Sequence, residues 1–136
     1  MEYLKRQKTL FRRLKHWIAA PFILGMLIPI FFTDILIEIY HRICFPLYGL
    51  EYVNRSNYIK IDRQRLSYLN WFQKLSCAYC GYANGTINYI QKIAGVTETY
   101  WCGIKHESEK GFHQQPHHKD FVKYGDEKAF KQRYAK

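Results

Sequence analysis

Four residues in the second half of the chain have the types and spacing of metal ligands. Cys77 and Cys80 are separated by two residues, and Cys102 and His106 by three. On helices these spacings place each pair on one face, so two antiparallel helices would present both pairs to one ion. The pattern predicts a site of three sulfurs and one nitrogen. Zinc is the first candidate, and iron or an iron–sulfur cluster is the alternative. No general-base carboxylate is evident beside these ligands, which favours a closed structural site.

Two other interpretations of the cysteines stay open. A Cys-x2-Cys pair such as Cys77 and Cys80 can form and exchange a disulfide, although such pairs usually open a helix and this one is expected to follow one. Free cysteines are also among the most buried residues and then act as small apolar groups. Cys44 lies in an apolar segment without a paired ligand, so it is not assigned to the metal site.

Two further polar groups are candidate sites. The stretch "HQQPHH" brings three histidines together, which predicts a second metal site or three exposed side chains without a ligand; they are His113, His117 and His118. Asp34, Glu38 and His41 share one helical face, and Glu38-x2-His41 has the spacing of di-metal carboxylate bundles. An ordinary ion pair of Glu38 with Arg42 is the favoured interpretation of this membrane-polar cluster.

Composition restricts the classes of function. The 136 residues carry a net charge of +10 and 18% aromatic residues, which predicts one modest folded protein with an anionic partner. The phosphate-binding motifs G-x-x-x-x-G-K-[ST] and G-x-G-x-x-G are missing, as is the serine-hydrolase motif G-x-S-x-G. Nucleotide-dependent and serine-hydrolase activities therefore lack support, and the sequence leaves open whether the protein is an enzyme.

The N-terminal fifty residues are expected to hold the chain at a membrane. Residues 1–16 predict a basic amphipathic segment that contacts anionic lipids rather than nucleic acid. Its cations are Lys5, Arg6, Arg12, Arg13 and Lys15. Residues 17–50 form a membrane-inserted segment, and its uncharged run over residues 17–33 is close to the shortest length that spans, about 17–25 residues.

Two topologies fit this segment. In the first, residues 18–40 span the bilayer. In the second, the chain turns between Pro29 and Asp34 and returns along the interface. Basic residues flank the segment on both sides, which favours a cytoplasmic location for both ends. The re-entrant, monotopic topology with a cytoplasmic C-terminal domain is therefore preferred.

The second half predicts a small helical domain over residues 56–110 and a polar basic tail over residues 111–136. Apolar spacing indicates a helix from Asp62 to Leu75, an interruption at the glycines of "CAYCGYANG", and further helices over residues 86–94 and from Thr97. The last dozen residues are expected to form a loosely held helix. The fold class is therefore all-α.

Several stretches of the chain resemble an uncharacterised family of small bacterial membrane proteins. They are "CFPLYG", "YLNWFQKLSCAYCGYANG", "ETYWCGIKH" and "YGDE", which cover roughly residues 40–127. The resemblance implies a bacterial inner-membrane protein and no particular activity. The predicted function is a membrane-anchored metal-binding module. A membrane-associated enzyme or thiol-redox protein acting on a lipid, quinone or thiol is the alternative. Other membrane proteins or a second copy of the chain are candidate partners.

Overall fold

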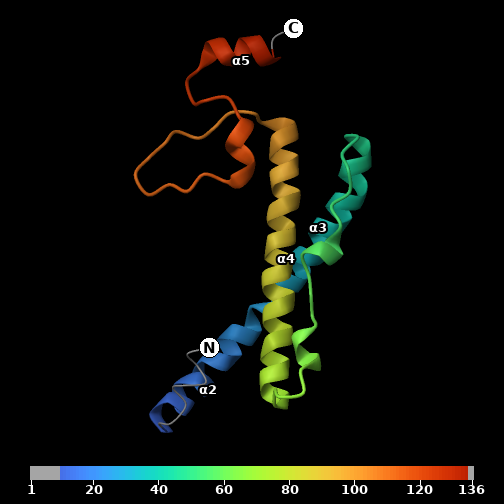
Figure 1. Ribbon diagram of the computed structural model, residues 1–136, viewed down its shortest axis with the longest axis vertical. Helices are drawn as coiled ribbons and strands as arrows, with labels where there is room; N and C mark the ends of the chain where they lie inside the picture. Colours follow the sequence, from blue (N-terminus) through green and yellow to red (C-terminus); the bar gives the residue numbers. More distant parts are fainter. Residues whose placement is uncertain (1–9, 135–136) are drawn as a thin grey trace. The chain divides into compact units, whose positions relative to one another are not determined.

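The computed structural model describes residues 10–134, except for the side chains of Leu10, Arg12 and Arg13. Four α-helices and three short 3₁₀ helices account for most of this part of the chain, and no strand is present in it (Figure 1). In chain order they are α2 (Leu10–Gly25), α3 (Leu27–Leu47), η1 (Arg55–Asn57), η2 (Arg63–Arg65), α4 (Trp71–Trp101), η3 (Pro116–Asp120) and α5 (Glu127–Tyr134). The all-α prediction is confirmed. The chain divides into two compact units, Met1–Ile87 and Asn88–Lys136.

Helices α2 and α3 form the apolar N-terminal segment. The segment Leu14–Leu47 is long and apolar enough to cross a membrane. Its most apolar 18 residues have a mean hydropathy of 2.2, and 6% of them are buried. Only Met26 interrupts the two helices, and its N–H still donates to the carbonyl of Phe22 at 3.3 Å. The turn predicted between Pro29 and Asp34 is wrong. Pro29 lies in the first turn of α3, where a missing N–H costs no hydrogen bond, so the helix continues through it.

Helix α4 begins later than the sequence pattern predicted. The side chain of Asn70 accepts a hydrogen bond from the N–H of Gln73 at 2.9 Å, and the side chain of Gln73 accepts one from the N–H of Asn70 at 3.0 Å. This reciprocal capping box satisfies two free donors and fixes the first residue as Trp71. Asp62, the expected cap, precedes only the short helix η2 and makes no capping bond with its side chain.

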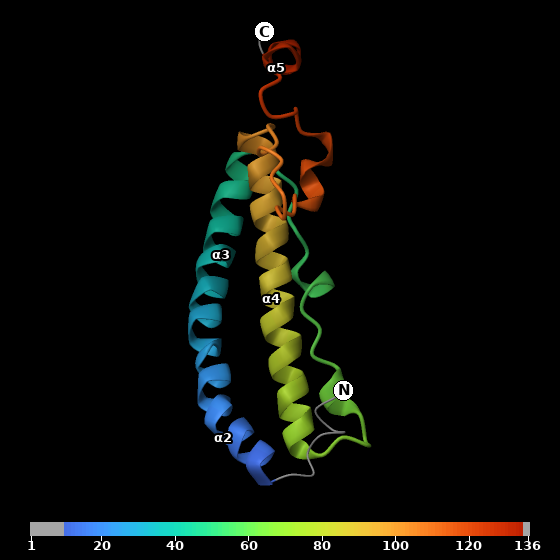
Figure 2. The same cartoon turned by 90° about the vertical axis from the view of Figure 1, so that its left-hand side faces the viewer.

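The glycines of "CAYCGYANG" do not interrupt α4, which runs unbroken for 31 residues. In both views the later part of the chain between α3 and α4 lies along the first half of α4 (Figure 2). A Cβ atom on Gly81 would lie 2.6 Å from the carbonyl oxygen of Lys60, and one on Gly85 would lie 2.7 Å from that of Tyr58. These glycines therefore allow an extended segment to contact the helix backbone, so the predicted interruption is wrong.

In the second unit, the chain after α4 folds back, so that η3 contacts the end of α4 and residue 122 pairs with residue 104. The N–H of Val122 donates to the carbonyl of Gly103 at 2.7 Å, which closes an isolated bridge between residues 104 and 122. The buried side chains of this unit are Tyr89, Ile93, His118, Phe121 and Val122. The predicted polar tail thus supplies three core residues, and its expected final helix is present as α5.

Candidate metal centre

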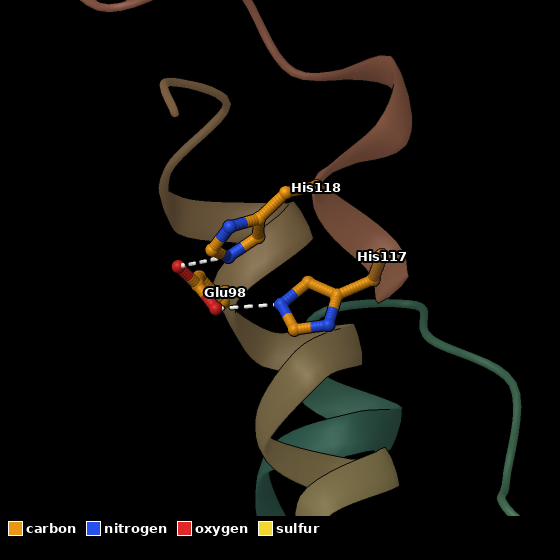
Figure 3. A group of neighbouring side chains, drawn as sticks. All are labelled: Glu98, His117 and His118. Carbon is orange, nitrogen blue, oxygen red and sulfur yellow. Dashed lines mark hydrogen bonds and ion pairs between the residues drawn. The ribbon is translucent and has the colours of Figure 1, made fainter. Parts of the chain in front are cut away.

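Three side chains of the second unit converge on one point: Glu98, His117 and His118. One ligand atom from each lies within 4.8 Å of the others, and this is the only such group of three among residues 10–134 (Figure 3). Nε2 of His117 lies 2.6 Å from Oε2 of Glu98, and Nε2 of His118 lies 2.9 Å from Oε1. Each oxygen of the Glu98 carboxylate is therefore hydrogen-bonded to a different imidazole.

Helical backbone carries all three side chains, and residues 102–115 connect the two helices. Glu98 lies in the last turns of α4. The two histidines are consecutive in η3, where Pro116 opens the helix in a position that needs no donor. The entry into η3 is held by a hydrogen bond from Nε2 of Gln91 on α4 to Oε1 of Gln115 at 2.8 Å.

Gly95 makes room for the ring of His117. A Cβ atom on Gly95 would lie 2.8 Å from Nδ1 of His117, closer than real Cβ atoms approach another atom, and 3.0 Å from its Cε1. Gly95 precedes Glu98 by three residues, so both lie on the same side of α4. The sequence pattern predicts a helix over residues 86–94 and therefore a helix end just before Gly95. Its observed role is to seat an imidazole against α4 within reach of the carboxylate.

Packing fixes the orientation of His118. Its side chain is 1% exposed, and its ring stacks on Phe121 with centroids 4.9 Å apart. Its buried Nδ1 has no hydrogen-bond partner among the residues described. Aromatic contacts, rather than a hydrogen bond to Nδ1, therefore direct Nε2 toward Glu98.

The two imidazoles also set the charge of the cluster. The hydrogen bond from His117 lowers the pKa of the Glu98 carboxyl below its ordinary value, and the hydrogen bond from His118 lowers it further. Glu98 is therefore a carboxylate at neutral pH. Two imidazoles and one carboxylate form the protein ligand set of several catalytic zinc sites and of non-haem iron(II) sites. Such a set leaves coordination positions open for water or a substrate.

The predicted second metal site thus contained two of these three residues. His113 is exposed and lies outside the group. His106, predicted as the fourth ligand of the cysteine site, is exposed, and its ring centroid lies 5.6 Å from that of His118. The sequence argument missed Glu98. No local spacing pointed to Glu98, because it precedes the two histidines by 19 and 20 residues.

The structure does not bring the four predicted cysteine-site ligands together. Cys77 and Cys80 belong to the first unit, and Cys102 and His106 to the second. The antiparallel helices that the site required are absent from residues 70–110, because α4 is a single helix through Gly81 and Gly95. All four cysteines of the chain have free thiols.

The membrane-polar cluster Asp34, Glu38 and His41 contacts the chain that follows α3, at Val53 and Arg55. Both guanidinium nitrogens of Arg55 donate to the buried Asp34, one of them at 2.6 Å, and Tyr82 donates to it at 2.9 Å. Burial and this hydrogen bond raise the pKa of Tyr82, and the hydrogen bond to Asp34 raises that of Arg55. Nε2 of the buried His41 accepts from the N–H of Val53 at 3.1 Å.

The ion pair predicted for this face is confirmed, with Nε of Arg42 2.9 Å from Oε1 of Glu38. Of the predicted lipid contacts, Lys15 is exposed and lies over the ring of Phe11, 4.6 Å from its centroid. Lys5 and Arg6 lie outside the described residues, as do the side chains of Arg12 and Arg13.

No protein-family model matches this chain, and neither a curated protein nor a solved structure matches it. The resemblance of residues 40–127 to a bacterial membrane family therefore stays a prediction. The proposed function therefore rests on the arrangement of Glu98, His117 and His118.

Proposed function

We propose that this protein is a membrane-anchored metal-binding module whose ion is held by Glu98, His117 and His118. The observation that carries the proposal is the convergence of three ligand atoms within 4.8 Å. An ion entering the cluster would replace the two histidine–carboxylate hydrogen bonds with metal–ligand bonds of about 2.0–2.2 Å. The apolar helix Leu14–Leu47 supplies the anchor by its length and composition. A bacterial inner-membrane location with a cytoplasmic C-terminal half completes the proposal.

The donor set favours zinc, with iron(II) second. Two nitrogens and one carboxylate oxygen suit both ions, whereas an iron–sulfur cluster needs thiolates that this group lacks. The exposed His106 is near enough to His118 to serve as a fourth ligand after a change of rotamer. A site with His106 bound is closed and structural, and a site without it keeps a position for water or substrate.

A competing explanation is a purely structural cluster, in which the two histidines only hydrogen-bond Glu98 and no metal ion binds. The two explanations differ in what Zn²⁺ does to the full-length protein. After treatment with a chelator in detergent, the protein should bind one equivalent of Zn²⁺ by isothermal titration calorimetry. Glu98→Gln and His118→Ala should each weaken binding by at least tenfold.

Matched controls come from the same segment. Glu109→Gln and His113→Ala change exposed residues outside the group, so they should bind Zn²⁺ as the wild type does. If the wild type bound no Zn²⁺, or if His113→Ala cost as much affinity as His118→Ala, the metal centre would be refuted.

A thiol-based activity is the second candidate, favoured by the position of Cys77 and Cys80 three residues apart on α4 in an apolar pocket. Oxidation of the two thiols to a disulfide would deliver two electrons and two protons to a quinone, giving the quinol. Mass spectrometry after incubation with a quinone tests this. A disulfide between Cys77 and Cys80 supports the activity, and two alkylatable thiols refute it.

A further inference from the structure

The first unit contains a cavity of about 390 Å³ that neither the metal centre nor the membrane anchor explains. One wall comes from α2 and includes Ala20, Ile23 and Leu24. The other comes from the start of α4 and includes Phe72, Cys77 and Cys80. The volume falls in the range of about 300–1,000 Å³ that is usual for small-molecule sites. The lining is apolar, so an apolar ligand fits it.

The apolar helix gives a ligand access from the bilayer. The α2 wall belongs to the segment Leu14–Leu47, whose large apolar side chains are mostly exposed. The hydroxyl of Tyr79 on α4 donates to the carbonyl of Ile23 on α2 at 2.9 Å, which joins the two walls. A hydrocarbon chain in the surrounding lipid would enter between these walls without crossing water.

Exposed aromatic residues next in sequence to the lining residues favour a position of the cavity near the headgroup level. Trp17, Tyr68 and Trp71 follow or precede the lining residues His16, Leu69 and Phe72 and are 78%, 76% and 75% exposed. Trp and Tyr are enriched where the hydrocarbon core meets the headgroups, because their rings have an apolar body and a polar edge. The exposed Lys15 directly precedes the lining residue His16. A positive charge at this level attracts an anionic headgroup.

We propose that this cavity binds the acyl chain of an anionic phospholipid, with the headgroup facing Lys15 and His16. The site is independent of the metal centre, since every lining residue belongs to the first unit. Ser76 and Gln73 supply polar atoms within an otherwise apolar wall. Cys77 and Cys80 lie in that wall, so a bound chain would cover their thiols.

A photoactivatable lipid tests the proposal on the full-length protein. Phosphatidylglycerol with a diazirine on its acyl chain would be placed at low fraction in phosphatidylcholine nanodiscs, and cross-linked peptides would be mapped by mass spectrometry. Labelling should concentrate on residues 20–24 and 69–80. Excess phosphatidylglycerol should reduce it at least fivefold, and equal amounts of phosphatidylcholine or a neutral quinone should not. The proposal would be overturned by uniform labelling along α2 and α3. It would also be overturned if phosphatidylcholine or the quinone reduced the labelling as much as phosphatidylglycerol does.

A cavity-filling variant provides the second arm. Ser76→Trp should reduce labelling of residues 69–80 at least fivefold, and Ser108→Trp, the same change at an exposed site outside the cavity, should leave it unchanged. Ala20→Phe fills the cavity from its other wall if Ser76→Trp does not fold. Zn²⁺ binding of each variant should match the wild type, which separates this result from the metal proposal. Unchanged labelling in a folded cavity-filling variant would refute the site.

Discussion

Asp34 in the first unit and Glu98 in the second are both helix-borne carboxylates with hydrogen bonds to two side chains, and the partners differ. Asp34 is bound by Arg55 and Tyr82, whereas Glu98 is bound by His117 and His118. A guanidinium has five donors and no lone pair to offer a metal, while a neutral imidazole can donate or ligate. A carboxylate with two side-chain partners therefore fixes Arg55 and Tyr82 in the first unit, an arrangement called the clamp below. In the second unit it forms a candidate metal centre. The partner side chain, not the carboxylate, decides its chemistry.

The largest expected effect comes from breaking the clamp. Arg55→Met leaves the buried Asp34 without its cation, which should lower the free energy of unfolding by about 3 kcal/mol. This is the low end for buried pairs, because the Arg55 side chain is 37% exposed. Thermal unfolding in detergent, followed by intrinsic fluorescence, measures the change.

Two controls sharpen this result. Arg63→Met, the same change at an exposed arginine of η2, should cost less than about 0.5 kcal/mol. The double variant Asp34→Leu with Arg55→Met should recover most of the loss, because no unpaired charge remains. Equal losses for Arg55→Met and Arg63→Met would show that the pair does not hold the returning segment.

Zinc should stabilise the molecule through only one of the two carboxylates. At a Zn²⁺ concentration 100 times the dissociation constant, stabilisation should be about 2.7 kcal/mol, since the ion binds only the folded state. Asp34→Asn should keep this increment, and Glu98→Gln should lose it. Differential scanning fluorimetry with and without Zn²⁺ measures the increment, and a response retained by Glu98→Gln would contradict the assignment.

Gly95→Ala should separate affinity for metal from overall folding. A methyl group 2.8 Å from Nδ1 of His117 forces the ring to move, so Zn²⁺ affinity should fall about 10- to 100-fold, as for lost supporting contacts at metal sites. The matched change Gly25→Ala meets nothing within 4 Å and should leave affinity unchanged. Titration calorimetry compares the two. Wild-type affinity in Gly95→Ala would indicate that the His117 ring is free to move.

The smallest expected effect is the response of the metal-free protein to acid. The folded state lowers the pKa of Glu98, chiefly through His117, so its stabilising contribution is complete above the ordinary carboxyl pKa. The contribution disappears as the pH falls through the lowered folded-state pKa. The carboxylate side chain is 31% exposed, which keeps the effect below about 1 kcal/mol. Melting temperatures of wild type and Glu98→Gln should converge at low pH, and a constant difference would exclude this linkage.

The sequence was most informative where a long periodic pattern decided the structure. The apolar run predicted a membrane-inserted segment over residues 17–50, and residues Leu14–Leu47 form helical structure long and apolar enough to cross a membrane, although the preferred turn after Pro29 is absent. The cluster of His113, His117 and His118 was one candidate metal site, and two of its members lie beside Glu98. It failed where a residue type serves two purposes. Gly81, Gly85 and Gly95 are of the residue type that commonly ends a helix. Here each one instead leaves room for a contact with a residue distant in sequence, where a Cβ atom would lie too close. Such contacts depend on tertiary packing, which local spacing does not encode.

The same reason explains the missed ligand. Glu98 joins the histidines only because η3 folds back onto α4, across 18 intervening residues. The four-ligand cysteine site failed for the opposite reason, since its residues were assumed to meet across a turn that α4 does not make. Pairs fixed within one helix were predictable, whereas pairs that depend on the return path of the chain were not.

The contact between residues 58–61 and α4 also bears on self-association. Gly81 and Gly85 form a G-x-x-x-G pattern, which in membrane proteins commonly lets two helices dimerise at close range. Here the backbone of Lys60 and Tyr58 already fills that groove within one chain. A second copy would have to expel this segment before using the glycines as a dimer seam. Homodimers of this protein are therefore expected to form through other surfaces.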